Sequence, residues 1–283
     1  MRDLSNRNLC AINTATLGFR APIDDVVDAV ARAGFGAIAP WRREVEGQDV
    51  AKISRHIRDA GLAVTGYCRS TYIPALTRLT FEQNVQANRL AITDAGALGA
   101  YSFVMVVGGL PTGSKDIAAA RAQVQEAAGL LVEHGRQHGV RIALEPLHPV
   151  YAADRSCLSL LSQALDMCEA VEGSSADPWL GACIDVYHVW WDPDLAGQIA
   201  RAGATRRIFG FHVCDWLVPT ADVLNDRGMM GDGVIDVRGI RNMAEIGGYR
   251  GAVEVEIFST KNWWKRSMEE TLQVCAERFA SVS

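Results

Sequence analysis

The chain has 283 residues, of which 49% are hydrophobic and 22% are charged. These values are typical of a globular protein with a large core, and they exclude wholesale disorder. The formal net charge of −5 argues against a general nucleic-acid binder and against a protein that docks on anionic membranes, because both usually carry an excess of basic residues.

The N-terminal residues lack the apolar segment of a signal peptide, and no run of about 18 uninterrupted apolar residues occurs, so we expect a cytoplasmic protein without a membrane span. The seven cysteines are widely spaced and form no CxxC pair. We therefore expect reduced, buried thiols rather than a disulfide framework or a cysteine-ligated zinc site.

Short apolar runs alternate with longer amphipathic stretches, and this pattern predicts eight strands, each followed by a helix. The predicted strands are residues 9–13, 37–40, 63–68, 102–107, 141–145, 181–185, 208–213 and 252–257. The predicted helices are residues 23–33, 50–60, 81–98, 117–138, 158–171, 195–202, 237–246 and 267–279. Glycines such as Gly61, Gly99 and Gly139 stand directly after helical stretches, where helix C-caps lie.

Eight strand–helix units without a linker rich in proline, glycine or serine favour a single-domain (β/α)8 TIM barrel over residues 1–283. A doubly wound open sheet is the alternative. It would place a glycine-rich phosphate-binding turn after the first strand. The segment there, residues 13–18, contains Gly18 as its single glycine, so the sequence favours the barrel.

In a TIM barrel, catalytic side chains come from the C-terminal ends of strands, and alternation along each strand decides which of them point inward. In the strand predicted over 208–213, Phe209, Phe211 and Val213 should face the helices, while His212 should face the barrel interior. The same alternation makes four consecutive strands end in an inward carboxylate or imidazole: Glu145, Asp185, His212 and Glu256.

Three carboxylates cannot share a low-dielectric barrel mouth without a counter-charge. A divalent cation supplies one, and three carboxylates with one imidazole suit Mn²⁺, Mg²⁺ or Co²⁺. The pattern therefore predicts one divalent ion, Mn²⁺ in first place, at Glu145, Asp185, His212 and Glu256. Glu254 shares the inward face one step deeper, and we expect it to be hydrogen-bonded inside the barrel rather than to be a ligand.

At these residues the sequence resembles the xylose-isomerase-like TIM-barrel superfamily, in particular its branch of sugar isomerases and epimerases, which includes ketose 3-epimerases and inosose dehydratases. The resemblance spans nearly the full chain and implies a metal on the same four side chains. The motifs that carry it are Glu145-Pro146-Leu147, Asp185-Val186-Tyr187-His188, His212-Val213-Cys214-Asp215, Gly231-Asp232-Gly233 and Glu254-Val255-Glu256-Ile257-Phe258.

In the ketose 3-epimerases of this branch, two metal-binding glutamates also act as the acid/base pair, which the resemblance carries over to Glu145 and Glu256. It implies further that His188 and Arg227 bind substrate oxygens. The connection over residues 214–230 is longer than that of ketose 3-epimerases. Relatives that act on 3-keto-glycosides, including C-glycoside deglycosidases, share the barrel and the metal set, so the substrate class stays open.

Aromatic and polar residues in the loops after the strands fit a pocket for a polyol, because aromatic rings stack on the C–H faces of sugars. Trp41 follows the second predicted strand, His148 follows the fifth and Trp216 follows the seventh. We expect these three residues to bind substrate, and we include Asp215, from the motif at the end of the seventh strand, among the candidates.

A metal chelated by a carbonyl oxygen and a neighbouring hydroxyl stabilises the enediolate that forms when a carboxylate removes the α-proton. Return of the proton gives epimerisation or isomerisation, whereas expulsion of a leaving group gives a lyase or dehydratase. We therefore expect an isomerase or epimerase of a ketose or keto-sugar. The alternative is a lyase or dehydratase of a keto-sugar or cyclitol, including an enzyme that cleaves 3-keto-glycosides.

Two further interpretations carry less support. A metal-dependent endonuclease of the same superfamily disagrees with the acidic net charge, and a non-catalytic sugar-binding barrel disagrees with the intact ligand set. We expect a small sugar substrate, a homo-oligomer with a possible second subunit, and neither nucleic acid nor membrane as partner.

Overall fold

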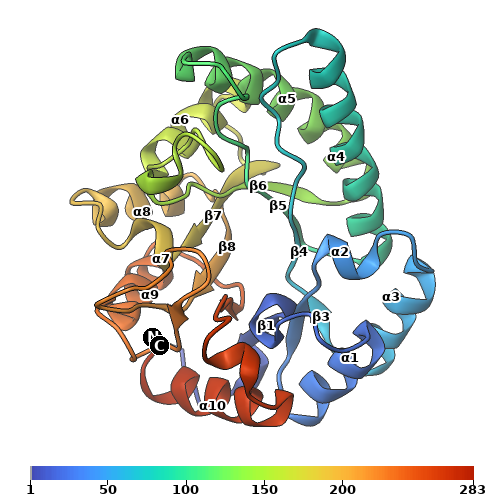
Figure 1. Cartoon of the computed structure of the whole chain (residues 1–283), viewed down its shortest axis with the longest axis vertical. Helices are drawn as coiled ribbons and strands as arrows, with labels where there is room; N and C mark the ends of the chain where they lie inside the picture. Colours follow the sequence, from blue (N-terminus) through green and yellow to red (C-terminus); the bar gives the residue numbers. More distant parts are fainter. Residues whose placement is uncertain (1) are drawn as a thin grey trace.

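The computed structural model describes residues 2–283 and shows a ring of parallel strands with helices around it (Figure 1). The strands of the ring are β1 (Cys10–Asn13), β2 (Ala37–Ala39), β3 (Ala63–Val64), β4 (Gly66–Cys68), β5 (Ser102–Met105), β6 (Arg141–Leu144), β7 (Leu180–Asp185), β8 (Ile208–Val213) and β11 (Val253–Val255). A separate antiparallel pair consists of β9 (Asp215–Trp216) and β10 (Arg227–Gly228).

The α-helices are α1 (Ile23–Arg32), α2 (Arg42–Val45), α3 (Val50–Asp59), α4 (Arg78–Leu98), α5 (Ile117–His138), α6 (Leu161–Glu172), α7 (Val186–Val189), α8 (Leu195–Ala204), α9 (Val237–Ile246) and α10 (Met268–Ser281). Short 3-10 turns cover Arg7–Leu9, Thr14–Leu17, Pro149–Tyr151 and Trp263–Lys265. Within residues 2–283, no helix has both the length and the apolar character that crossing a membrane requires.

Hydrogen-bonded neighbours in the ring follow the order β3-β2-β1-β11-β8-β7-β6-β5-β4. The strands at the two ends of this order, β3 and β4, are consecutive in the chain and are joined by Thr65. They occupy one strand position that is broken at Thr65, and this position closes the ring. The predicted (β/α)8 TIM barrel is therefore confirmed.

Local signals in the sequence set the ends of the helices. Thr77 and Asp116 each accept a backbone N–H from the third residue of the helix that follows, α4 and α5 respectively. Gly99 and Gly139 end these helices with φ of 77° and 70°, a left-handed conformation that glycine adopts without strain. The cap at Thr77 explains why α4 begins three residues before the predicted start at residue 81.

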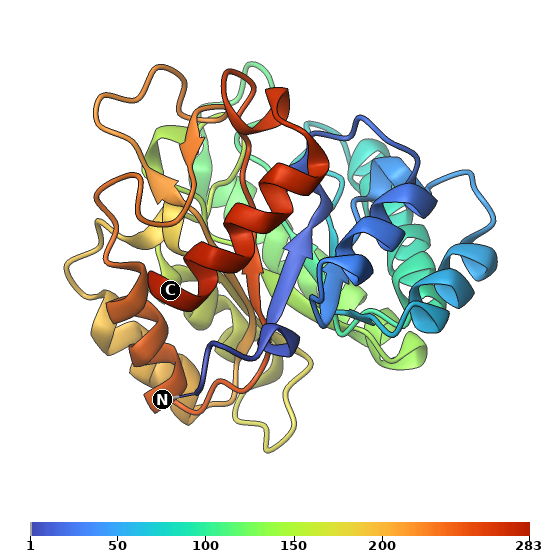
Figure 2. The ribbon, with the colours of Figure 1, turned by 90° about the horizontal axis from the view of Figure 1, so that it is seen from below.

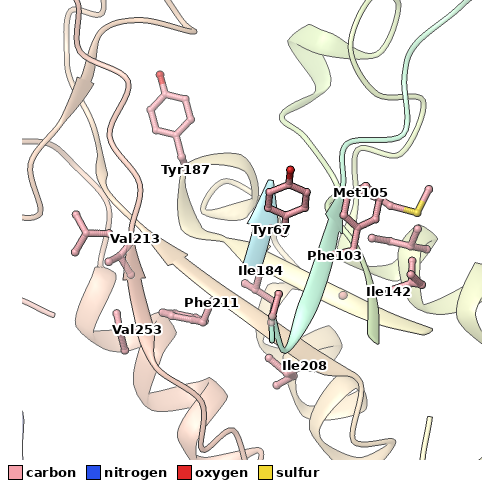
Figure 3. Packing of buried hydrophobic residues seen from close by; sticks show 14 of the residues in the cluster. Tyr67, Phe103, Met105, Ile142, Ile184, Tyr187, Ile208, Phe211, Val213 and Val253 are labelled. Atoms are coloured by element: carbon pink, nitrogen blue, oxygen red, sulfur yellow. The ribbon is translucent and has the colours of Figure 1, made fainter. Parts of the chain in front are cut away.

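The outer face of the ring packs against the helices. Phe211 and Val213 on β8 and Val253 on β11 belong to the main hydrophobic core, as alternation predicts, and lie side by side (Figure 3). Phe209 differs from the prediction. A register shift between β7 and β8 places it in a separate inner cluster with residues such as Cys183, because a β-bulge breaks the strict alternation.

Several short elements were not predicted. The helices α2 and α7 have four residues each, too few for a helical period to show in the sequence. The pair β9–β10 lies inside the long connection after β8 and pairs Trp216 with Arg227. All seven cysteines are buried and free, as expected.

Substitutions at two helical glycines, Gly203 and Gly129, test how tightly the helices pack. A Cβ at Gly203 in α8 would overlap the carbonyl oxygen of Gly247, whereas a Cβ at Gly129 in α5 meets its nearest neighbour, a methyl group of Val171, at 3.9 Å. Gly129→Ala should raise the free energy of unfolding by about 0.5–1 kcal/mol because alanine favours the helix. Gly203→Ala should lower it. Thermal unfolding checks both variants, and shifts of the same sign would contradict the packing described.

Candidate metal centre and active site

Four ionisable side chains meet at the C-terminal ends of neighbouring strands. Asp185 ends β7, His212 lies near the end of β8, and Glu145 and Glu256 directly follow β6 and β11. Because β6, β7, β8 and β11 are adjacent in the ring, the four side chains converge. Each is at most 4% exposed, and their ligand atoms lie within 4.8 Å of one another. The loops around them gather at the upper end of the barrel in Figure 2.

The arrangement leaves two buried polar atoms without a hydrogen-bond partner among the described residues: Glu145 Oε1 and His212 Nδ1. The two atoms lie 3.1 Å apart, but in an orientation that forms no hydrogen bond. A buried polar atom without a partner costs free energy, and a cation bound between these atoms would satisfy both. The residues present therefore fit a divalent metal ion.

Cys183 is a further candidate ligand, because its sulfur lies within reach of Glu145 and His212. Sequence reasoning missed it. Burial raises the pKa of the Cys183 thiol well above its usual range. A thiol must lose its proton to bind a metal well, so the carboxylates are the stronger ligands at this place.

The electrostatics of the cluster also favour a cation. Arg227 Nη1 donates to Asp185 Oδ2 at 2.9 Å and to Glu256 Oε2 at 3.1 Å. Burial raises the pKa of Glu256 to about 6 and raises the pKa of Asp185 against the opposing effect of Arg227. Burial and the charge of Arg227 hold the pKa of His188 well below its usual range, so His188 adds no positive charge.

Within residues 2–283, the basic groups that pair directly with these carboxylates are Arg227, His212 and the neutral His188. At most two positive charges thus pair directly with four buried carboxylates. The resulting excess of negative charge is what a divalent ion would neutralise. The four carboxylates belong to Glu145, Asp185, Glu254 and Glu256.

A small cavity of about 20 Å³ lies beside two of the four side chains, Glu145 and Glu256. Its walls include Glu145, Glu256, His188, Arg227 and Leu224. This is room for about one water molecule and not for a sugar. Leu224, on the segment between β9 and β10, closes part of this wall.

Two hydrogen bonds hold that segment over the barrel mouth. The hydroxyl of Tyr187 donates to the carbonyl of Val223 at 2.8 Å, and the backbone N–H of Thr260 donates to the carbonyl of Asn225 at 3.0 Å. The long connection after β8, which the sequence showed as an unusual feature, is thus the cover of the site.

The structure brings some of the expected substrate-binding residues to this cavity. Arg227 and His188 lie in its wall, with Arg227 Nη2 3.2 Å from His188 Nε2. Trp41 also lines it, and its indole N–H donates to Asn13 Oδ1 at 2.7 Å.

Three other expected residues lie outside the cavity wall. Trp216 stacks on Tyr187 at 4.7 Å between ring centroids and lies 4.9 Å from the ring of His148. Asp215 departs furthest from its expected role. Its carboxylate accepts backbone N–H groups from Trp216, Gly231 and Ile235, so its contacts close the loop.

Sequence reasoning missed Asn13 and Thr65, whose side chains donate to Glu254 at 2.8 and 2.6 Å, and Arg155, which lines the small cavity. Alternation along the first predicted strand could have found Asn13, because it ends that strand. Its amide does not ionise, so Asn13 stands outside the set of strand-end carboxylates and imidazole. Thr65 carries no such signal in the sequence, because only the structure shows that its strand is interrupted at this residue.

Comparison with known proteins supports the fold. The family model described as xylose isomerase-like TIM barrel matches residues 27–277. The solved structure of protein SMc04130 from Sinorhizobium meliloti 1021 is 49% identical, covers 98% of each chain and gives a TM-score of 0.93. The comparison with curated proteins gives no match.

Two more distant solved structures share the fold. IolI with a bound zinc atom is 16% identical, covers 96% of this chain and 97% of its own, and gives a TM-score of 0.82. D-psicose 3-epimerase in the presence of D-fructose is 14% identical, with coverage of 97% and 99% and a TM-score of 0.76. At such identities the likeness shows a shared fold, and the family model spans most of the sequence. The chain therefore belongs to the xylose isomerase-like TIM barrel family.

Proposed function

We propose that this protein is a divalent-metal-dependent isomerase or epimerase that acts on a ketose or keto-sugar. One observation carries the proposal: Glu145, Asp185, His212 and Glu256 offer ligand atoms within 4.8 Å of one another at the catalytic end of the barrel. The fold shared with D-psicose 3-epimerase and with zinc-bound IolI supports a sugar substrate and a metal. The mixed oxygen and nitrogen ligands favour Mn²⁺, with Mg²⁺ or Co²⁺ as alternatives.

When bound, a divalent ion would polarise a substrate carbonyl and make the neighbouring C–H group more acidic. Glu145 and Glu256 extend from β6 and β11, which flank β7 and β8 in the ring. They therefore approach a substrate at the centre from two sides. One carboxylate removes the proton on the carbon beside the carbonyl, and the other returns a proton from the opposite side, which inverts that carbon.

Arg227 and His188 would orient the substrate. The guanidinium of Arg227 lies 4.5 Å from the ring centre of Tyr187 and 5.0 Å from that of Phe258, and it is anchored by Asp185. A guanidinium packed against two aromatic rings keeps its donors in place. In an opened site, substrate oxygens would meet these donors directly, since both side chains line the cavity wall.

Elimination is the second candidate. The same proton removal leads to a lyase or dehydratase when the substrate carries a leaving group β to its carbonyl. The cover over residues 214–230 favours this alternative for one reason: its length departs from the connection expected of ketose 3-epimerases. A keto-sugar, a cyclitol or a 3-keto-glycoside would be the substrate.

Metal content tests the site. After chelator treatment and reloading with Mn²⁺, elemental analysis should find one divalent ion per chain. His212→Ala and Asp185→Asn should weaken binding by about tenfold or more, because each removes or neutralises a ligand. Glu44→Gln is the control, since Glu44 is a half-buried carboxylate that accepts from Thr14 and stands outside the cluster. A wild-type protein without stoichiometric metal would remove the basis of the proposal.

Isotope exchange tests the chemistry. The Mn²⁺-loaded protein is incubated in D₂O with ketoses, inososes and 3-keto-glucosides, and the products are analysed by NMR and mass spectrometry. One deuterium on one carbon with otherwise unchanged mass indicates epimerisation or isomerisation, whereas loss of water or aglycone indicates elimination.

Two variants test the acid/base pair in the same assay. Glu145→Gln and Glu256→Gln should each lower turnover by about 10²-fold or more, because each replaces a proton-accepting carboxylate by an amide of similar shape. The circular dichroism spectrum should stay that of the wild type. Full turnover by both variants would refute the roles given to the two glutamates.

A further inference from the structure

We propose that Glu254 is a positioning residue that fixes the imidazole of His212 with Nδ1 toward the metal centre. The inference rests on the proposed function, because it gives Glu254 a role toward the metal held by the four strand-end residues. Glu254 itself stands outside that set of ligands, two residues before Glu256 in the chain and level with His212 on β8.

The two nitrogens of His212 face different partners. His212 Nε2 lies 3.1 Å from Glu254 Oε1, while Nδ1 lies 3.1 Å from Glu145 Oε1 and 3.8 Å from Glu256 Oε2. A neutral imidazole carries one proton, and a carboxylate at Nε2 draws the proton to that atom. The lone pair is then on Nδ1, the nitrogen that faces the candidate metal ligands.

Glu254 is in turn held on both of its oxygens. Asn13 Nδ2 donates to Oε1 at 2.8 Å and Thr65 Oγ1 donates to Oε2 at 2.6 Å. The residue is 3% exposed. Rotating its carboxylate toward the metal centre would break these bonds, so the geometry suits an anchor for His212. Partners of this kind orient metal-binding histidines and strengthen them as ligands.

A second cavity lies on the other side of Glu254. It has a volume of about 740 Å³ and reaches Glu254 and His212 from the N-terminal end of the barrel. Arg206 and Arg250 at its rim are exposed, and Gly66 in its wall would bring a Cβ to 3.8 Å from Glu254 Oε2. Removing the Glu254 side chain therefore opens a space next to His212 that small ions can reach from solvent.

This access provides a sharp test. Mn²⁺ affinity is measured by calorimetry for the wild type, Glu254→Gln and Glu254→Ala, with and without sodium formate. Glu254→Ala should bind Mn²⁺ about 10–100-fold more weakly, the usual cost of losing such a partner. Glu254→Gln should lose less, because its amide oxygen still accepts from His212. Formate should restore part of the affinity of Glu254→Ala and leave the wild type unchanged.

A spectroscopic readout separates positioning from a general structural role. In the Zn²⁺-loaded wild type, ¹⁵N NMR of His212 should show a protonated Nε2 and a metal-bound Nδ1. Glu254→Gln, which preserves the shape of the side chain, keeps the test open if Glu254→Ala fails to fold.

The outcomes are distinguishable. If the wild type binds Mn²⁺ and both Glu254 variants bind it equally well without an effect of formate, the role of Glu254 is refuted while the proposed function stands. A proton on Nδ1 in the metal-loaded wild type would refute it as well. A wild type that binds no metal overturns the proposed function and this inference with it.

Discussion

Buried negative charge at one end of the barrel is the constraint on which the rest of this structure depends. Glu145, Asp185, Glu254 and Glu256 surround His212, and each is at most 4% exposed. Charges removed from water in this way have to be paired or neutralised. Arg227 neutralises part of the charge by bridging Asp185 and Glu256. A divalent cation would neutralise the rest.

The surrounding elements can be understood as support for this group. Arg227 comes from β10, and β10 exists because the long connection after β8 folds back and pairs with β9. The carboxylate of Asp215 closes that connection through three backbone N–H groups. The long connection, held in place by these contacts, thus positions the basic side chain of Arg227 and also covers the mouth of the barrel.

The two ends of the barrel differ in a way that suits this arrangement. The C-terminal end is nearly filled, with about 20 Å³ of free space among polar side chains, whereas the N-terminal end contains a cavity of about 740 Å³. Glu254 and His212 lie between them. Glu254, hydrogen-bonded to Asn13 and Thr65, thus separates the candidate metal centre from the larger cavity.

The sequence by itself determined the barrel, and it singled out the four strand-end residues and Glu254, because periodicity and alternation are local properties of a chain. It also predicted that Glu254 is hydrogen-bonded inside the barrel, and the bonds from Asn13 and Thr65 confirm this. Only the tertiary structure decided what depends on contacts between distant segments. The bulge that turns Phe209 inward, the backbone contacts that occupy Asp215 and the closure of the mouth by Leu224 arise from neighbouring strands and loops, which leave no periodic signal in the sequence.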